Sequence, residues 1–206
     1  ITALNAATSG HVAEGSTGGG TGMICYEFKG GTGTASRQLK LGGETYTLGA
    51  LVQANHGIRP WLNVLGKAVG ELMPEGRLIE QETGSIIVIL GTDAPLSSLA
   101  LRQTAKRAAI GVGRGGSPGG NSSGDIFLAF SVANDHPMPQ QDEAILQRTE
   151  LNSELLDPFY LATVEAVEEA VVNAIVAGED AETVKPVGHV CRAIETKALA
   201  DLFNDK

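Results

Sequence analysis

Apolar positions along the 206-residue chain change their spacing from segment to segment, and the spacing predicts the secondary structure. Residues 85–90 (SIIVIL) form a continuous apolar, β-branched run, which is typical of a strand covered on both faces. Residues 126–132 (IFLAFSV) form a second buried run of this kind. Segments with β-branched or aromatic residues predict three earlier strands, at 23–29, 37–41 and 45–54.

Helical spacing is found in other apolar segments. Residues 98–110 place Leu and Ala at i, i+3 and i+4 intervals, which predicts an amphipathic helix. Residues 155–177 predict a longer helix that ends at Gly178, a typical C-terminal stop residue. Residues 188–203 predict a last helix, and residues 3–8 resemble the final turns of another. Because the strands come in a block with helices outside it, we expect an α+β sandwich with helices over stacked sheets.

Glycine contributes 27 residues, about 13% of the chain against a usual ~7%, so many backbone positions are expected to be tight. The glycines are concentrated in a loop at 10–22, a predicted turn at 30–36 and a loop at 111–124. Neither loop contains GxxxxGK followed by Ser or Thr, the phosphate-binding pattern. The glycine content therefore does not indicate a nucleotide cofactor.

The net charge of −9 argues against a nucleic-acid partner, because such proteins normally carry a basic stripe. One cationic cluster is present and predicts a solvated helix face; its members are Arg102, Lys106, Arg107 and Arg114. No apolar run reaches the ~18–20 residues of a membrane span, so we expect no membrane partner. We expect a soluble protein of the cytoplasm or the periplasm, a choice that the sequence leaves open.

Two cysteines, Cys25 and Cys191, are too few for a disulfide framework. Both lie among apolar neighbours, so we expect them to be buried and free. The sequence contains no CxxC and no HExxH pattern, and we expect no metal site.

Ser85 places a hydroxyl group where the irregular segment 61–84 meets the most apolar predicted strand. If the Gly84–Ser85 bond were cut, Ser85 would carry both a nucleophilic Oγ and a free α-amine. An α-amine has a reference pKa of about 7.7–8.0, so it acts as a general base near neutral pH without a histidine. Gly84 removes side-chain bulk and permits a strained conformation. The alternative is that Ser85 only caps a strand.

Two further groups carry candidate chemistry. Asn55 has an amide that donates to a developing oxyanion, although Asn-x-Gly is also typical of an Asx-turn. His56 beside it is a candidate base, or only an exposed or hydrogen-bonded turn residue. Ser123 and Asp125 lie two residues apart before a strand, so on a strand their side chains share one face. A carboxylate there orients a hydroxyl or an ammonium group; the alternative is a simple turn.

Five segments, in order, resemble the L-aminopeptidase/D-esterase family, which includes the β-peptidyl aminopeptidases. The matching segments are VAEGSTGGGTGMICYEFKGGTGTASR (12–37), LVQANHG (51–57), TGSIIVILGTDAPL (83–96), GNSSGDIFLAFSVAN (120–134) and LDPFYLATVEAVEEAVVNA (156–174). The resemblance covers nearly the whole chain and is more specific than any single glycine loop.

The resemblance implies a precursor that cleaves itself between Gly84 and Ser85. The freed Ser85 is then the nucleophile, and its own amine is the base. Asn55 matches the family asparagine that helps to form the oxyanion hole. Ser123 and Asp125 match the pair that positions the nucleophile or relays protons.

The implied fold is an αββα four-layer sandwich, similar to N-terminal-nucleophile hydrolases but differently connected. The implied activity is release of an N-terminal residue from a short peptide, amide or ester through an acyl-enzyme, with no metal or organic cofactor. Residues 1–206 then form one domain, divided by self-cleavage into the end of an α-subunit (1–84) and a β-subunit (85–206). The family also implies a homo-oligomer of such αβ units.

Family chains continue further toward the N-terminus, and we expect this chain to lack that part, which supplies a tyrosine and an acidic residue to the site. Two alternatives to the aminopeptidase stay open. One is a glutamate N-acetyltransferase-like enzyme of the same fold, although that class uses threonine as the new N-terminus. The other is an inactive binding or assembly module.

Overall fold

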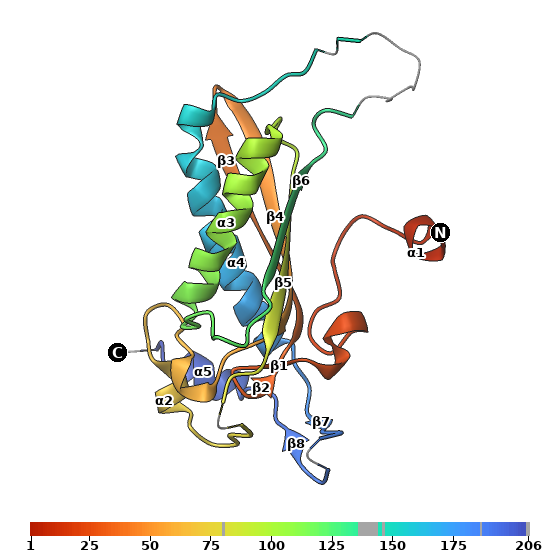
Figure 1. Ribbon diagram of the computed structural model, residues 1–206. Helices are drawn as coiled ribbons and strands as arrows, with labels where there is room; N and C mark the ends of the chain where they lie inside the picture. Colours follow the sequence, from red (N-terminus) through yellow and green to blue (C-terminus); the bar gives the residue numbers. More distant parts are fainter. Residues whose placement is uncertain (80, 136–143, 146, 186, 205–206) are drawn as a thin grey trace.

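The computed structural model describes residues 1–79, 81–135, 144–145, 147–185 and 187–204 (Figure 1). The helices are α1 (Thr2–Asn5), α2 (Val69–Leu72), α3 (Ser98–Arg114), α4 (Asp157–Val176) and α5 (Thr196–Asp201), with short 3-10 turns η1 (Gly18–Gly22), η2 (Arg59–Trp61) and η3 (Ser153–Leu155). The strands are β1 (Ile24–Cys25), β2 (Phe28–Lys29), β3 (Gly31–Leu41), β4 (Glu44–Asn55), β5 (Ser85–Thr92), β6 (Ile126–Ser131), β7 (Ala181–Glu182) and β8 (Val190–Cys191).

Four of these strands form one sheet in the order β3-β4-β5-β6. β3 and β4 pair antiparallel across a turn at Gly42 and Gly43, whose positive φ values of 62° and 90° suit residues without a Cβ atom. β5 runs antiparallel to β4, and β6 runs parallel to β5 after a crossover that contains α3. The pairing of β4 with β5 places Asn55 opposite Ser85.

The helices α3 and α4 lie side by side on one face of this sheet (Figure 1). α4 packs against β3 and β4, while α3 packs against α4 and β6. The helix α4 approaches the sheet closely at Gly33, where a Cβ atom would lie only 1.9 Å from the Ala170 carbonyl oxygen. Glycine in β3 therefore lets the long helix approach the sheet backbone.

The other face of the sheet is open. Along β5, residues 86, 88, 90 and 92 are buried, whereas residues 85, 87, 89 and 91 are not. Between 41% and 58% of the side chain is exposed for the apolar residues Ile87, Ile126, Leu128 and Phe130. The prediction that both apolar strands are buried on both faces is therefore wrong for the described residues. The physical reason is that the long helices cover the opposite face, and no comparable layer covers this one in the described part of the chain.

Most long elements match their predictions. The α+β class is confirmed, and the described residues contribute one main sheet and one helical layer. The helix predicted at 155–177 is α4, and the helix predicted at 98–110 is α3, which continues to Arg114. The cysteines Cys25 and Cys191 are both buried and free, as predicted.

Three predicted elements are wrong in kind or extent. The predicted strand at 23–29 is divided into β1 and β2, because Tyr26 and Glu27 adopt left-handed φ values of 49° and 61° and turn the chain. Of the turn predicted at 30–36, residues 31–36 lie in β3, where glycine allows close packing and does not reverse the chain. The helix predicted at 188–203 is limited to α5, and β8 occupies part of its expected first turns.

Candidate active site

The candidate nucleophile Ser85 is the first residue of β5 and is half-buried. It pairs with Asn55, the last residue of β4, and paired residues of antiparallel strands share a face. The Ser85 Oγ accepts a hydrogen bond from the backbone N–H of Gly124 at 2.9 Å. The hydroxyl therefore has a defined position at one end of the open sheet face.

The amide of Asn55 is oriented by a backbone contact. Its Oδ1 accepts a hydrogen bond from the N–H of Ile24 at 2.9 Å, so β1 holds the side chain by its oxygen. With Oδ1 engaged, the Nδ2 group is left as the donor end of the amide. A fixed N–H donor beside Ser85 is the kind of group that stabilises a developing oxyanion.

Ser123 and Asp125 contact each other and the nucleophile strand. The Ser123 hydroxyl donates to Asp125 Oδ1, and the same oxygen accepts from the N–H of Ile86 at 3.0 Å. Asp125 is therefore anchored to the residue that follows Ser85. The structure brings all four candidate site residues to the same end of β5, although Ser123 and Asp125 lie in the loop before β6 rather than on a strand.

Gly84 fits closely against Asn55. A Cβ atom on Gly84 would lie 1.9 Å from the Asn55 carbonyl oxygen, so a larger residue would displace the backbone at Gly84 or at Asn55. The N–H of Gly84 donates to Glu82 Oε1 at 2.7 Å. Glu82 was not predicted as a site residue, because it lies in a segment without any periodic pattern and nothing in the sequence marks it as buried.

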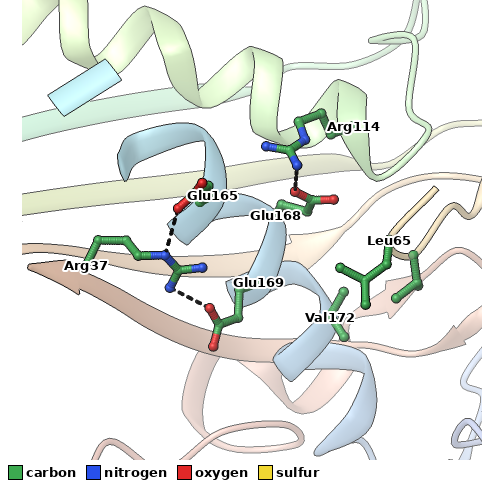
Figure 2. A pocket seen from close by; sticks show the side chains of 8 residues that line it. Arg37, Leu65, Arg114, Glu165, Glu168, Glu169 and Val172 are labelled. Atoms are coloured by element: carbon green, nitrogen blue, oxygen red, sulfur yellow. Dashed lines mark hydrogen bonds and ion pairs between the residues drawn. The ribbon is translucent and has the colours of Figure 1, made fainter. Parts of the chain in front are cut away.

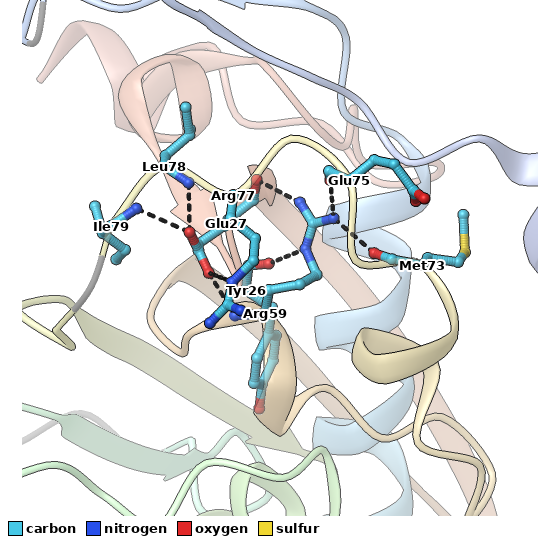
Figure 3. Close-up of polar contacts among 8 residues, drawn as sticks. All are labelled: Tyr26, Glu27, Arg59, Met73, Glu75, Arg77, Leu78 and Ile79. Carbon is cyan, nitrogen blue, oxygen red and sulfur yellow. Dashed lines mark hydrogen bonds and ion pairs between the residues drawn. The ribbon is translucent and has the colours of Figure 1, made fainter.

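The segment that leads to Gly84 is held by the buried Arg59 (Figure 3). Its guanidinium donates to the carbonyl oxygens of Met73 at 2.9 Å and Glu75 at 2.5 Å. It also donates to the carbonyl of Tyr26 at 2.9 Å and lies 3.3 Å from the ring centroid of Phe28. Burial lowers the pKa of Arg59 to about 10, so it stays protonated at neutral pH.

The fully buried Glu27 holds the next part of the same segment. Its Oε1 accepts from the N–H groups of Leu78 and Ile79, the latter at 2.8 Å, and its Oε2 accepts from the N–H of Arg59 at 2.7 Å. Arg77 approaches the same carboxylate at 4.0 Å. A left-handed residue other than glycine is strained by roughly 1–3 kcal/mol, and these contacts oppose that strain. The amino-acid sequence does not predict this cluster, because most of the partners are backbone groups.

His56, next to Asn55, is buried and packs edge-on against Tyr26 at 5.0 Å between ring centroids. Its Nδ1 lies 3.8 Å from the Cys25 sulfur, and its Nε2 has no hydrogen-bond partner among the described groups. Burial lowers the pKa of His56 to about 4, with Asp125 acting weakly in the opposite direction. His56 is therefore neutral at pH 7 and is neither exposed nor an ordinary turn residue.

A separate cavity of about 480 Å³ lies beside α4 (Figure 2). Ion pairs form part of the cavity wall. Arg37 pairs with Glu165 at 3.1 Å and with Glu169 at 2.5 Å, and Arg114 pairs with Glu168 at 3.0 Å. Since each of these arginines is already paired with a carboxylate and none of the four candidate site residues lines the cavity, we do not assign it to the active site.

The described residues contain no group of three or more His, Cys, Asp or Glu side chains arranged to hold a metal ion. Among the same residues, no helix combines the length and the hydrophobicity needed to cross a membrane.

A model of peptidase family S58 matches residues 1–188. The chain belongs to peptidase family S58. The resemblance to L-aminopeptidase/D-esterase enzymes is confirmed by this match and by the relatives. The β-peptidyl aminopeptidase BapA of Sphingosinicella microcystinivorans is 46% identical over 194 residues, which cover 87% of this chain and 49% of that protein. The S58 chain therefore spans about half the length of the curated relatives it matches.

Two solved structures show the same fold at high identity. The L-aminopeptidase D-Ala-esterase/amidase of Ochrobactrum anthropi is 50% identical, with a TM-score of 0.90 over 98% of this chain and 55% of that one. A β-aminopeptidase of Burkholderia sp. is 44% identical, with a TM-score of 0.85 over 97% of this chain and 56% of that one. The first is described as a prototype of the serine aminopeptidases and a variant of the Ntn hydrolase fold. The fold class implied by the sequence resemblance is thus confirmed.

Proposed function

We propose that this S58 chain carries the nucleophile of a self-processing serine aminopeptidase. It cleaves its own Gly84–Ser85 bond, and the freed Ser85 then releases N-terminal residues from short peptides, amides or esters. The observation that carries the proposal is the pairing of Ser85 with Asn55 beside a glycine that cannot be enlarged. Residues 1–84 and 85–206 are then two subunits of one domain, and αβ units assemble as homo-oligomers.

In self-processing, the Ser85 hydroxyl attacks the carbonyl carbon of Gly84. The amide N–H of Asn55 stabilises the negative charge that develops on the carbonyl oxygen. Asp125, which accepts hydrogen bonds from Ser123 and from the N–H of Ile86, keeps the strand end and the loop in register during the attack. The Gly84–Ser85 C–N bond then breaks and frees the Ser85 α-amine, which takes up the hydroxyl proton, and water hydrolyses the resulting ester to a Gly84 carboxylate and the Ser85 hydroxyl.

In turnover, that α-amine is the general base for the Ser85 hydroxyl, because its reference pKa of about 7.7–8.0 leaves part of it neutral at pH 7. The attack forms an acyl-enzyme on Oγ and expels the leaving amine or alcohol, and water then releases the acyl group. A pKa of about 4 makes His56 a weak proton acceptor, and its buried ring packs against Tyr26, so the α-amine is the better base for the hydroxyl.

The names of the relatives support short peptides and amino-acid amides or esters as substrates. Membership of a peptidase family favours a hydrolase over the N-acetyltransferase-like alternative, which uses threonine rather than Ser85. It also argues against an inactive binding or assembly module, the second alternative.

The test is hydrolysis of a panel of amino-acid p-nitroanilides by the parent chain and its Ser85→Ala variant. We expect turnover by the parent and none by Ser85→Ala, with Ser122→Ala, a nearby exposed serine, as the matched control that stays active. Hydrolysis retained by pure Ser85→Ala would refute the nucleophile assignment. Absence of hydrolysis by the parent would contradict activity of this chain on its own.

A further inference from the structure

Glu82 is a buried carboxylate three residues before the candidate nucleophile, with 7% of its surface exposed. Its two oxygens have separate partners. Oε1 accepts from the N–H of Gly84 at 2.7 Å, and Oε2 accepts from the N–H of Gly57. One carboxylate thus connects the residue before the cleavage point to the loop that follows Asn55.

The surroundings of Glu82 are unusual for a buried acid. No Lys, Arg or His forms an ion pair with it in the described part of the chain, and both of its hydrogen-bond donors are backbone N–H groups. The side chain also packs against the glycine-rich loop, since a Cβ atom on Gly120 would lie 3.0 Å from Glu82 Cγ. Burial of a carboxylate without a cation costs free energy. The two backbone N–H groups, whose directions are fixed by the chain, offset part of this cost for Glu82.

These contacts restrict the backbone of Gly84 from two sides. Its N–H is held by Glu82, and its Cα lies against the Asn55 carbonyl, where even a Cβ atom has no room. The next residue, Ser85, is already fixed by pairing in β5. A glycine held in this way has little freedom to turn its carbonyl carbon away from the neighbouring hydroxyl.

We propose that Glu82 is a positioning residue for self-cleavage: it holds Gly84 so that the carbonyl carbon faces Ser85 Oγ. The inference rests on the proposed function. In the step it serves, Oγ forms a bond to the Gly84 carbon, the Gly84–Ser85 C–N bond breaks, and the hydroxyl proton passes to the freed nitrogen. Water then hydrolyses the ester to a Gly84 carboxylate and a Ser85 hydroxyl. Glu82 exchanges no proton in either step.

The experiment follows cleavage of newly synthesised chain by intact mass, after cell-free translation and a chase. Glu82→Gln keeps the size of the side chain but turns an N–H₂ group toward one of the backbone donors. We expect cleavage to slow about 10- to 100-fold, the usual effect of losing a hydrogen bond to a charged group. The matched control is Glu75→Gln, which removes the same charge from an exposed side chain of the same segment. Its rate is expected to stay within about twofold of the parent, as for other surface changes.

Hydroxylamine separates the two chemical steps, because it cleaves an ester but not the original peptide bond. If Glu82 positions Gly84, the ester does not accumulate in Glu82→Gln, and hydroxylamine leaves its cleavage slow. Restoration of the parental rate by hydroxylamine would place the effect in ester hydrolysis and overturn the proposal. Once cleaved, Glu82→Gln is expected to turn over substrate at the parental kcat per free Ser85 amine, whereas a merely structural role would lower kcat as well.

The remaining outcomes are also decisive. If Glu82→Gln is unfolded at the assay temperature, Glu82→Asp keeps the charge but shortens the side chain, and slow cleavage by folded Glu82→Asp supports the proposal. Failure of both variants to fold would assign Glu82 a structural role only. If the parent chain cleaves and Glu82→Gln cleaves equally fast, the role of Glu82 is refuted but the proposed function is not. If the parent chain never cleaves, the proposed function itself is refuted.

Discussion

Replacement of Asn55 by alanine separates a catalytic effect from a structural one, because the two ends of its amide have different partners. Oδ1 accepts from the Ile24 N–H at 2.9 Å, while Nδ2 is assigned to the oxyanion. Loss of an oxyanion donor lowers kcat by about 10²–10³. Loss of the Ile24 contact costs about 1 kcal/mol of unfolding free energy, which for a chain of this size lowers Tm by about 2–4 °C.

The assay measures kcat on an amino-acid p-nitroanilide, normalised to chains with a free Ser85 amine, together with Tm. Asn55→Asp retains an oxygen for Ile24 but replaces the donor, so we expect Tm near that of the parent and a kcat as low as in Asn55→Ala. Gln53→Ala is the matched control on the same strand face: it loses its 2.9 Å bond to Thr32 Oγ1 and should keep its kcat. A normal kcat in Asn55→Ala would leave Asn55 with a structural role only, through its contact with Ile24, and refute the oxyanion assignment.

Three further predictions concern stability. In Gly33→Ala, the added Cβ would lie 1.9 Å from the Ala170 carbonyl, so urea unfolding should show a loss of about 1–3 kcal/mol; an unchanged midpoint would contradict the close approach of α4 to β3. Arg59→Met leaves the buried carbonyl oxygens of Tyr26 and Glu27 without their guanidinium donor and should cost about 1–3 kcal/mol for each by thermal unfolding, with a parental Tm as the contrary result. His56 has a pKa near 4 when folded and 6.5 as its ordinary value, so the unfolded chain binds more protons between these values. Unfolding free energy should therefore fall by about 3 kcal/mol as pH decreases from about 6.5 to about 4, and a His56→Leu variant with the same pH dependence would refute this.

Much of the sheet and its helical layer could be predicted from hydrophobic spacing alone. The start of β5 at Ser85 follows from an abrupt change between a segment without pattern and a continuous apolar run. α4 follows from a long helical repeat with Gly178 after its end. The same apolar run was misleading about burial, because spacing reports which side chains are apolar and not whether a second layer covers them. Ile87, for example, is an apolar residue of a kind common in cores, yet it lies on the open face and is 41% exposed.

The contacts around the cleavage point could not be predicted in the same way. Asn55 and Ser85 are 30 positions apart in the sequence, and only the β4–β5 register makes them neighbours. Family resemblance identified these two residues, but it did not identify Glu82 or Glu27, whose partners are backbone N–H groups without a sequence pattern. The left-handed turn at Glu27 is also invisible in the sequence, because it uses neither glycine nor asparagine.

N-terminal sequencing of the purified chain after incubation shows whether Ser85 becomes a chain terminus. We expect two pieces, residues 1–84 and 85–206, with a new terminus that reads Ser-Ile-Ile-Val, and a Ser85→Ala variant that stays whole. A parent chain that remains intact, or one that is cut at any other bond, would contradict this expectation.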